Sequence, residues 1–203
     1  MSVKVKICGL TVPGDVDAAV DLGADALGFN CWPGSRRYVT PDRAARLVER
    51  LPPFVAAVGV FVNQPRAHVL RIIREVGLTH VQLHGDERAE DCAGYPVPVL
   101  RGVRVTGAAA LRGLRAYRVQ GLLIDAPAPG YGGGGQPFDW RLLRGWRAPR
   151  PFLLAGGLTP ANVAQAIRAV RPYGVDVASG VEQAPGRKNV KKLRAFLRAA
   201  KGA

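Results

Sequence analysis

The chain has 203 residues, of which 48% are hydrophobic and 22% are charged. This composition is typical of a folded globular protein and excludes a disordered chain, a collagen-like fibre and a coiled coil. The net charge of +14 is uneven, because residues 139–203 hold 13 bases and 3 acids. Such a bias attracts nucleic acid, an acidic surface or an anionic small molecule, and the charge alone leaves all three open.

Two sequence features bear on the compartment. The longest apolar run, residues 54–62, is far shorter than the roughly 20 residues that cross a bilayer, and the first residues alternate apolar and charged side chains. We therefore expect no membrane span, no secretory signal and a cytoplasmic location. Cys8, Cys31 and Cys92 form no C-x-x-C pair, so the sequence suggests neither a disulfide framework nor a structural metal site.

Short apolar runs alternate with helical patterns along the whole chain. The runs predict strands over 3–8, 25–29, 55–62, 80–84, 97–103, 121–125, 152–155 and 175–178. The patterns between them predict helices over 13–22, 41–50, 65–76, 86–93, 108–116, 139–145, 160–170 and 189–200. Thr40-Pro41 and Thr159-Pro160 each read as a helix start, with a capping hydroxyl before a proline at the first helical position.

Strict alternation of strand and helix implies a parallel sheet, because parallel neighbours need crossover connections. Eight units close a barrel, whereas the rival doubly wound sheet usually carries a G-x-G-x-x-G motif after its first strand, which is missing here. The glycine-rich stretch 130–135 falls between a strand and a helix and separates no compositionally distinct halves. We predict an α/β protein in which residues 1–203 form a single-domain (β/α)8 TIM barrel.

In such a barrel the active site lies at the C-terminal ends of the strands. Cys8 and Asp125 end the first and sixth strands, and strand alternation turns both toward the barrel interior. A thiol there is either a buried small hydrophobe or, as a thiolate, a base or nucleophile. A carboxylate that ends an apolar strand needs either a partner such as the next backbone amide or a functional role.

Further candidates follow other strands. Gly156-Gly157 and Ser179-Gly180 come after the seventh and eighth strands, where many barrels hold a phosphate, although glycine turns have the same pattern. Arg36-Arg37 either clamps a carboxylate or is solvated surface. His80, Gln82 and His84 share one strand face, with His84 placed to contact a substrate and His80 placed for a structural role.

Two predictions concern charge. Asp176 on the eighth strand and Lys6 on the first both face inward on neighbouring strands, so we expect a buried ion pair between them. The apolar stripe on helix 189–200 predicts a barrel helix whose basic residues cover its solvated face.

Seven motifs in chain order together resemble one family, and they reach from the first strand to the last helix. The cysteine motif and Val-Gln-Leu-His-Gly are the most specific of them. They are Lys6-Ile7-Cys8-Gly9-Leu10-Thr11, Gly59-Val60-Phe61-Val62-Asn63, Val81-Gln82-Leu83-His84-Gly85, Leu123-Ile124-Asp125, Phe138-Asp139-Trp140, Ala155-Gly156-Gly157-Leu158 and Ser179-Gly180-Val181-Glu182. The family is that of the phosphoribosylanthranilate isomerases of tryptophan biosynthesis.

The resemblance implies an aldose–ketose interconversion, the Amadori rearrangement of N-(5'-phosphoribosyl)anthranilate, without metal or other cofactor. Matched to the family, Asp125 would be the general acid that opens the sugar ring, and Cys8 the general base that removes the C2 proton. The remaining matches assign Arg37 to the substrate carboxylate. They assign the phosphate to Gly156, Gly157, Ser179 and Gly180, and the lining of the site to Gln82 and His84.

Three departures qualify this match. Ser35-Arg36-Arg37-Tyr38 replaces Ser-Pro-Arg-Tyr, which leaves open whether Arg36 or Arg37 holds the carboxylate. Residues 132–135 are all glycine where the family has a threonine, and Asn189 replaces an aspartate at a helix start while remaining a capping residue.

Other functions stay open beside the resemblance. The related histidine-pathway isomerase carries an aspartate where Cys8 stands, and a metal-dependent epimerase needs a ligand pattern that this chain lacks. A basic, non-catalytic nucleic-acid-binding barrel is the alternative from a different class, although no aromatic interleaving or known module accompanies the charge. The resemblance implies a phosphorylated small-molecule partner, with neither nucleic acid nor membrane, and leaves the oligomeric state open.

Overall fold

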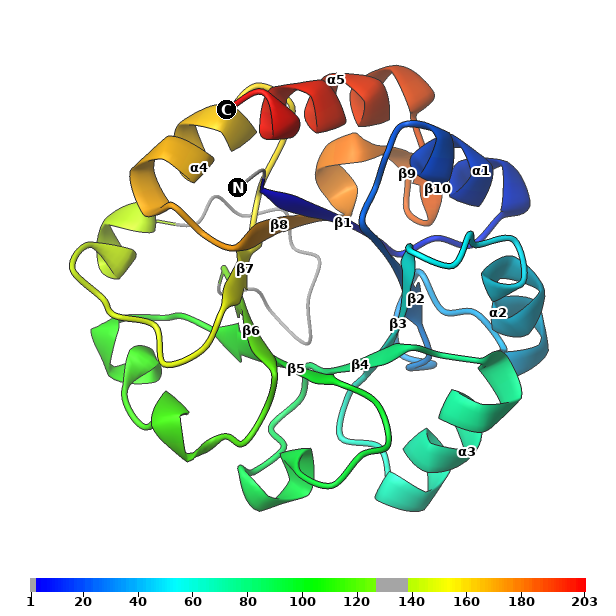
Figure 1. The fold of residues 1–203 in the computed structure, drawn as a ribbon, viewed down its shortest axis with the longest axis horizontal. Coiled ribbons are helices and arrows are strands. Elements are labelled where there is room, and N and C mark those ends of the chain that lie inside the picture. The colour runs from blue at the N-terminus through cyan, green and yellow to red at the C-terminus, as the bar shows by residue number, and fades with distance from the viewer. Residues whose placement is uncertain (1–2, 127–138) are drawn as a thin grey trace.

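The computed structural model describes residues 3–126 and 139–203, and these form a closed barrel of parallel strands surrounded by helices (Figure 1). The strands pair in chain order and β8 returns to β1. They are β1 (Lys4–Cys8), β2 (Ala26–Asn30), β3 (Ala56–Phe61), β4 (His80–Leu83), β5 (Val99–Arg104), β6 (Gly121–Asp125), β7 (Phe152–Leu154) and β8 (Gly174–Val177). The predicted fold class is confirmed, with every strand within two residues of its expected bounds.

Five of the eight expected helices form as α-helices in the outer ring. They are α1 (Pro13–Asp21), α2 (Pro41–Val48), α3 (Arg66–Val76), α4 (Val163–Val170) and α5 (Val190–Lys201). The Thr40 hydroxyl caps α2 by accepting from the backbone N–H of Arg43, as predicted. The predicted start at Thr159-Pro160 is wrong, because α4 begins only after Asn162, whose carboxamide oxygen accepts from the Thr159 N–H.

The other three expected helices are wrong, and short 3-10 turns stand in their place. They are η1 (Glu90–Cys92), η2 (Ala108–Leu111), η3 (Leu114–Ala116) and η4 (Trp140–Leu143). Glycines in left-handed conformations end or divide these segments: Gly94 after η1, Gly113 between η2 and η3, and Gly145 after η4. Each segment is therefore too short to continue as an α-helix.

A hairpin that was not predicted follows β8. After the turn η5 (Ser179–Val181), strands β9 (Glu182–Ala184) and β10 (Arg187–Lys188) pair antiparallel around Pro185-Gly186. Gly186 adopts φ 77°, which glycine accommodates without strain and which suits a tight turn after proline. The hairpin returns the chain to the end of β1, where Lys188 becomes buried.

The register between β1 and β8 brings two charged side chains together inside the barrel. Lys6 lies opposite Asp176, and its Nζ donates to Asp176 Oδ1 at 2.7 Å with the lysine side chain 1% exposed. The predicted buried ion pair is confirmed. Elsewhere Leu123 of β6, Leu153 of β7 and Ala155, just after β7, form a separate apolar cluster, and Leu100 of β5 packs against it.

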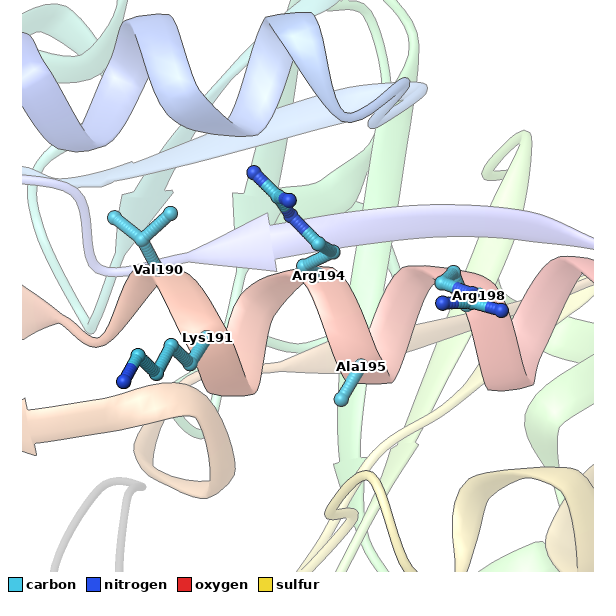
Figure 2. Close-up of a pocket in the computed structure, with 5 residues that line it drawn as sticks. All are labelled: Val190, Lys191, Arg194, Ala195 and Arg198. Atoms are coloured by element: carbon cyan, nitrogen blue, oxygen red, sulfur yellow. The ribbon is translucent and has the colours of Figure 1, made fainter.

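The solvated basic face predicted for the last helix is also confirmed. Leu193, Phe196 and Leu197 lie on the buried face of α5. Its exposed face lines a pocket of about 380 Å³ (Figure 2), formed by Val190, Lys191, Arg194, Ala195 and Arg198. The Asn189 side chain caps this helix by accepting from the Lys192 N–H at 3.0 Å, as predicted. Among the described residues no helix has the length and apolar character of a membrane span.

Candidate active site

Cys8 ends β1 beside Lys6 and Gly28, which the sequence analysis did not connect with it. A Cβ atom built on Gly28 of β2 would lie 2.8 Å from Cys8 Sγ and 3.2 Å from Lys6 Nζ. The missing side chain of Gly28 therefore provides the space in which the thiol and the ammonium meet. Burial raises the pKa of the Cys8 thiol above its usual value, and the positive charge of Lys6 opposes that rise.

Lys6 remains a cation in this buried place. Burial alone would lower its pKa, but Asp176 and Cys8 together act against that effect, and the pKa of Lys6 is raised overall. Its charge therefore persists at neutral pH.

Asp125 ends β6, and its carboxylate has two polar contacts among the described residues. Its Oδ1 accepts from the Ala126 N–H at 2.8 Å, and its Oδ2 lies 3.3 Å from His84 Nε2. The Ala126 N–H is the backbone partner that the sequence offered as the alternative to a functional role. It contacts only Oδ1 and leaves Oδ2 to other partners. His84 thus brings an imidazole ring close to the candidate acid.

Gln82 and His84 lie together on β4 and just after it, both buried. Gln82 Nε2 donates to His84 Nδ1 at 2.8 Å, so the ring proton sits on Nε2, which faces Asp125. Gly102 on β5 leaves room for the imidazole, because a Cβ there would overlap the ring. His80, at the start of β4, contacts the Thr79 hydroxyl instead, consistent with the structural role expected of it.

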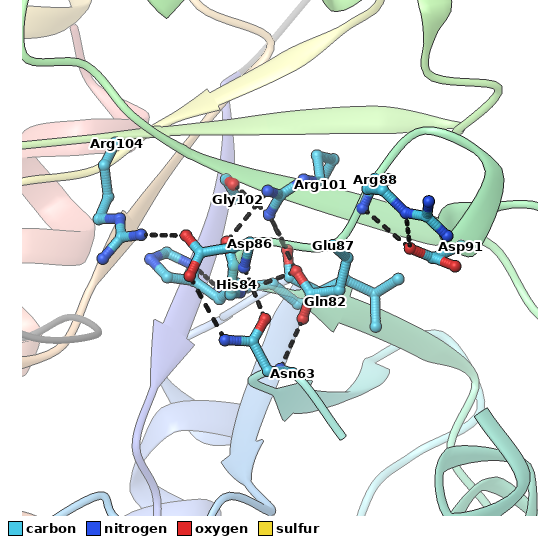
Figure 3. Close-up of polar contacts among 12 residues, drawn as sticks. Asn63, Gln82, His84, Asp86, Glu87, Arg88, Asp91, Arg101, Gly102 and Arg104 are labelled. Atoms are coloured by element: carbon cyan, nitrogen blue, oxygen red, sulfur yellow. Dashed lines mark hydrogen bonds and ion pairs between the residues drawn. The ribbon is translucent and has the colours of Figure 1, made fainter. Parts of the chain in front are cut away.

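The loop that follows His84 is held by a buried arginine that sequence reasoning missed (Figure 3). Arg101 on β5 donates from Nη1 to the Leu83 carbonyl at 3.0 Å and from Nη2 to the Gly85 carbonyl at 3.0 Å. The same Nη1 lies 3.2 Å from the Glu87 carboxylate, which in turn accepts from the Gly85 N–H. The available signal was an arginine inside the apolar run 97–103.

The two arginines after β2 differ in their surroundings. The Arg37 side chain packs against the backbone of Gly9, next to Cys8, whereas Arg36 is exposed. Glu182 accepts from Arg37 Nε at 2.9 Å and from Nη2 at 2.7 Å. This carboxylate partner within the chain was not predicted.

Lys188 completes the same cluster from the hairpin. Its Nζ donates to Glu182 Oε1 at 2.9 Å and to the Cys8 carbonyl at 2.5 Å. Burial lowers the pKa of Lys188, and burial opposes ionisation of Glu182, but Arg37 and Lys188 hold the Glu182 pKa below its usual value. The Pro-Gly turn was the signal that could have revealed the hairpin.

The four residues expected to bind phosphate lie in two loops that touch. Gly156 and Gly157 adopt φ values of 83° and 64° after β7, and Ser179 and Gly180 begin η5 after β8. Gly180 packs against the Leu158 carbonyl so closely that a Cβ would overlap it. The structure therefore brings both glycine turns to one region, as the strand order predicted.

Part of the predicted motif set lies outside the described residues, namely Gly132 to Gly135 and Phe138. Within 3–126 and 139–203, no three His, Cys, Asp or Glu side chains gather as metal ligands would.

Comparison with known proteins adds the family to this geometry. The family model described as N-(5'-phosphoribosyl)anthranilate isomerase matches residues 5–199. The chain belongs to this family. An isomerase of this name from Myxococcus xanthus is 53% identical over 206 residues, covering 99% of this chain and 97% of that protein.

Solved structures of the family agree with the fold. Phosphoribosylanthranilate isomerase of Thermotoga maritima superposes with a TM-score of 0.93 at 43% identity, covering 99% of this chain and 100% of that one. A second isomerase structure, in complex with reduced 1-(o-carboxyphenylamino)-1-deoxyribulose 5-phosphate, has a TM-score of 0.90 at 41% identity, with coverage of 99% and 100%. Membership of this isomerase family confirms the first of the functions weighed from the sequence, the isomerase of tryptophan biosynthesis.

Proposed function

We propose that this chain converts N-(5'-phosphoribosyl)anthranilate to 1-(2-carboxyphenylamino)-1-deoxyribulose 5-phosphate, with Asp125 as general acid and Cys8 as general base. The observation that carries the assignment is their placement at the C-terminal ends of β6 and β1 in a closed barrel. Acid and base must act on different parts of one sugar, and strands three positions apart around the barrel present them from different sides of its mouth.

The first step is ring opening. Asp125 donates a proton to the furanose ring oxygen as the C1–O bond breaks, and the anthranilate nitrogen takes up the positive charge as an iminium. His84 Nε2, 3.3 Å from Asp125 Oδ2, orients the carboxyl group for this transfer. The contact from the Ala126 N–H fixes the other oxygen, so that one carboxyl edge faces the substrate.

The second step is proton removal. The iminium acidifies the C2–H bond, and the Cys8 thiolate takes this proton to give an enolamine, which becomes the ketose as a proton returns to C1. Atoms and electrons balance within the sugar, so the step needs no external oxidant or reductant, and we propose no cofactor. The positive iminium also stabilises a thiolate beside it.

Substrate binding uses the remaining residues. A guanidinium offers five N–H donors, of which Glu182 takes two from Arg37, and we assign the free edge of the fork to the anthranilate carboxylate. We assign the phosphate to the backbone amides of Gly156, Gly157, Ser179 and Gly180, and the lining of the mouth to Gln82 and His84. A phosphorylated small molecule in the cytoplasm is the partner that we propose.

The test is turnover of N-(5'-phosphoribosyl)anthranilate by Cys8→Ala and Asp125→Ala. We expect each variant to lose at least ~10²-fold in kcat, the lower end for a positioned acid or base. Cys92→Ala and Asp17→Asn are matched controls, because Cys92 is a buried thiol elsewhere and Asp17 is an exposed carboxylate paired with Arg50. Wild-type turnover in either test variant would refute the role given to that residue.

A further inference from the structure

We propose that Lys6 is a positioning residue for Cys8: its buried ammonium, held by Asp176, stabilises the thiolate that acts as base. The inference rests on the proposed function only in taking Cys8 as that base. It gives the ion pair between β1 and β8 a role beyond filling the barrel.

The geometry places the cation beside the thiol. Lys6 and Cys8 are two residues apart on β1, so both side chains face the interior. Their Nζ and Sγ atoms lie 3.2 Å and 2.8 Å from the same point above Gly28, and are therefore at most about 6 Å apart. At 1% exposure, the Lys6 side chain has almost no water to screen its charge.

The charge balance around Cys8 favours an anion there. Lys6, Lys188 and Arg37 supply three positive charges, and Asp176 and Glu182 supply two negative ones, with ion pairs joining Lys6 to Asp176 and Glu182 to the other two. One positive charge is left over, which a Cys8 thiolate would balance.

Two further carboxylates form no ion pair with Lys6, Lys188 or Arg37 among the described residues. Asp15 accepts from the backbone N–H of Lys188, not from its ammonium. Asp125 faces His84 across the mouth of the barrel. Burial raises the pKa of Cys8 and Asp176 adds to that rise, while Lys6 and Lys188 act against it and lower the pKa.

Asp176 keeps Lys6 protonated, but the negative charge of Asp176 also offsets part of the stabilisation that Lys6 gives to a Cys8 thiolate. An unpaired buried lysine would lose its proton, because burial disfavours the cation. With Asp176 at 2.7 Å, Lys6 stays protonated. A purely structural role would not need these charges, because an apolar pair of similar volume fills a core at least as well as a buried ion pair.

The test removes both charges together, since either one left alone would be buried without a partner. The double variant Lys6→Met/Asp176→Asn is compared with wild type by the rate at which iodoacetamide alkylates Cys8 from pH 5 to 11, followed on the Cys8 peptide by mass spectrometry. Cys8 is partly exposed, whereas Cys31 and Cys92 are buried. The midpoint of the profile is the readout, because thiolate nucleophilicity also changes with pKa.

We expect the midpoint to rise by at least about one pH unit, which corresponds to about a tenfold smaller thiolate fraction at neutral pH. We also expect kcat to fall with little change in KM. Lys4→Met/Asp25→Asn is the matched control, since it removes the ion pairs of Asp25 with Lys4 and Lys201 at the other end of β1, and its profile should match wild type. If the first pair of substitutions unfolds the protein, Lys6→Gln/Asp176→Asn retains a hydrogen bond and gives the same readout.

A midpoint equal to that of wild type in a folded double variant would overturn the inference and leave Cys8 as the proposed base. Wild-type turnover by Cys8→Ala would instead overturn the base assignment, whatever the alkylation profile shows.

Discussion

His84 Nε2 lies 3.3 Å from Asp125 Oδ2 although β5 separates their strands in the barrel. Gly102 on β5 makes the contact possible, because any side chain there would overlap the imidazole. The ring thus reaches across an intervening strand to the candidate acid. Its orientation depends on Gln82, which donates to the opposite ring nitrogen.

We expect His84→Ala to lower kcat about tenfold or more, because Asp125 loses the group that orients its reactive oxygen. Steady-state kinetics with N-(5'-phosphoribosyl)anthranilate measure this effect. His80→Gln is the matched control at the opposite end of β4 and should leave kcat unchanged. Equal kcat values for His84→Ala and wild type would show that Asp125 needs no such partner.

Gly28→Ala should disturb Cys8 without adding any charge. The new methyl group would lie 2.8 Å from Sγ and 3.1 Å from the Cα of Cys8, so that both the thiol and the β1 backbone would have to shift. We expect a loss of at least about tenfold in kcat and a destabilisation of about 1–3 kcal/mol from overpacking. Kinetics and urea unfolding measure the two effects.

Gly14→Ala is the control for this substitution. No atom lies within 4 Å of a Cβ built at Gly14, which is in α1, so alanine there should leave activity unchanged and should not reduce stability. A Gly28→Ala variant that behaves like Gly14→Ala would show that the space beside Cys8 is not needed.

Glu182→Gln should destabilise the protein in a pH-dependent way. Arg37 and Lys188 would lose their shared buried counter-charge, and we expect a loss of about 3 kcal/mol at pH 7. The folded-state pKa of Glu182 is below its usual value of 4.5, so its contribution is present above that pH and is lost as the pH falls through the lowered value.

The difference in unfolding free energy between wild type and Glu182→Gln should therefore shrink below about pH 4.5. Glu75→Gln removes an exposed carboxylate paired with Arg71 along α3 and should change stability by no more than about 0.5 kcal/mol. A difference that stays constant from pH 7 to pH 3 would contradict the ionic origin of the effect.

Arg101→Leu should loosen the loop after β4. Three carbonyls and Glu87 lose their buried donor, and we expect a destabilisation of about 3 kcal/mol together with a lower kcat, since the loop carries His84. Arg50→Leu removes an exposed ion pair with Asp17 and should leave stability nearly unchanged. Denaturant unfolding measures the stability of both variants, and steady-state kinetics measure their kcat.

The sequence predicted those parts of the molecule that depend on periodicity. Strand alternation was enough to place Lys6 opposite Asp176 across the barrel seam, because inward parity and strand order fix which side chains can meet. The same logic brought the glycine turns after β7 and β8 together.

The parts that were missed depend on the paths of single side chains. The pairing of Arg37 with Glu182 and the burial of Lys188 both follow from the hairpin of β9 and β10, whose strands of three and two residues are too short to show a period. The prediction of three helices was wrong because it rested on the residue types in those segments. Glycines in left-handed conformations, such as Gly113, interrupt or end the segments and keep the helical turns short.

The ion pair between Lys6 and Asp176 joins residues 170 positions apart, across the seam where β8 closes the barrel against β1. Contacts of such long sequence separation form late in folding, because loop-closure entropy must be overcome before they form. During synthesis the segment that carries Cys8 emerges first, and it waits for β8 to complete its surroundings. Assembly of the reactive thiol is thus coupled to completion of the whole fold, so a truncated chain that lacks β8 would present Cys8 without its ionic environment.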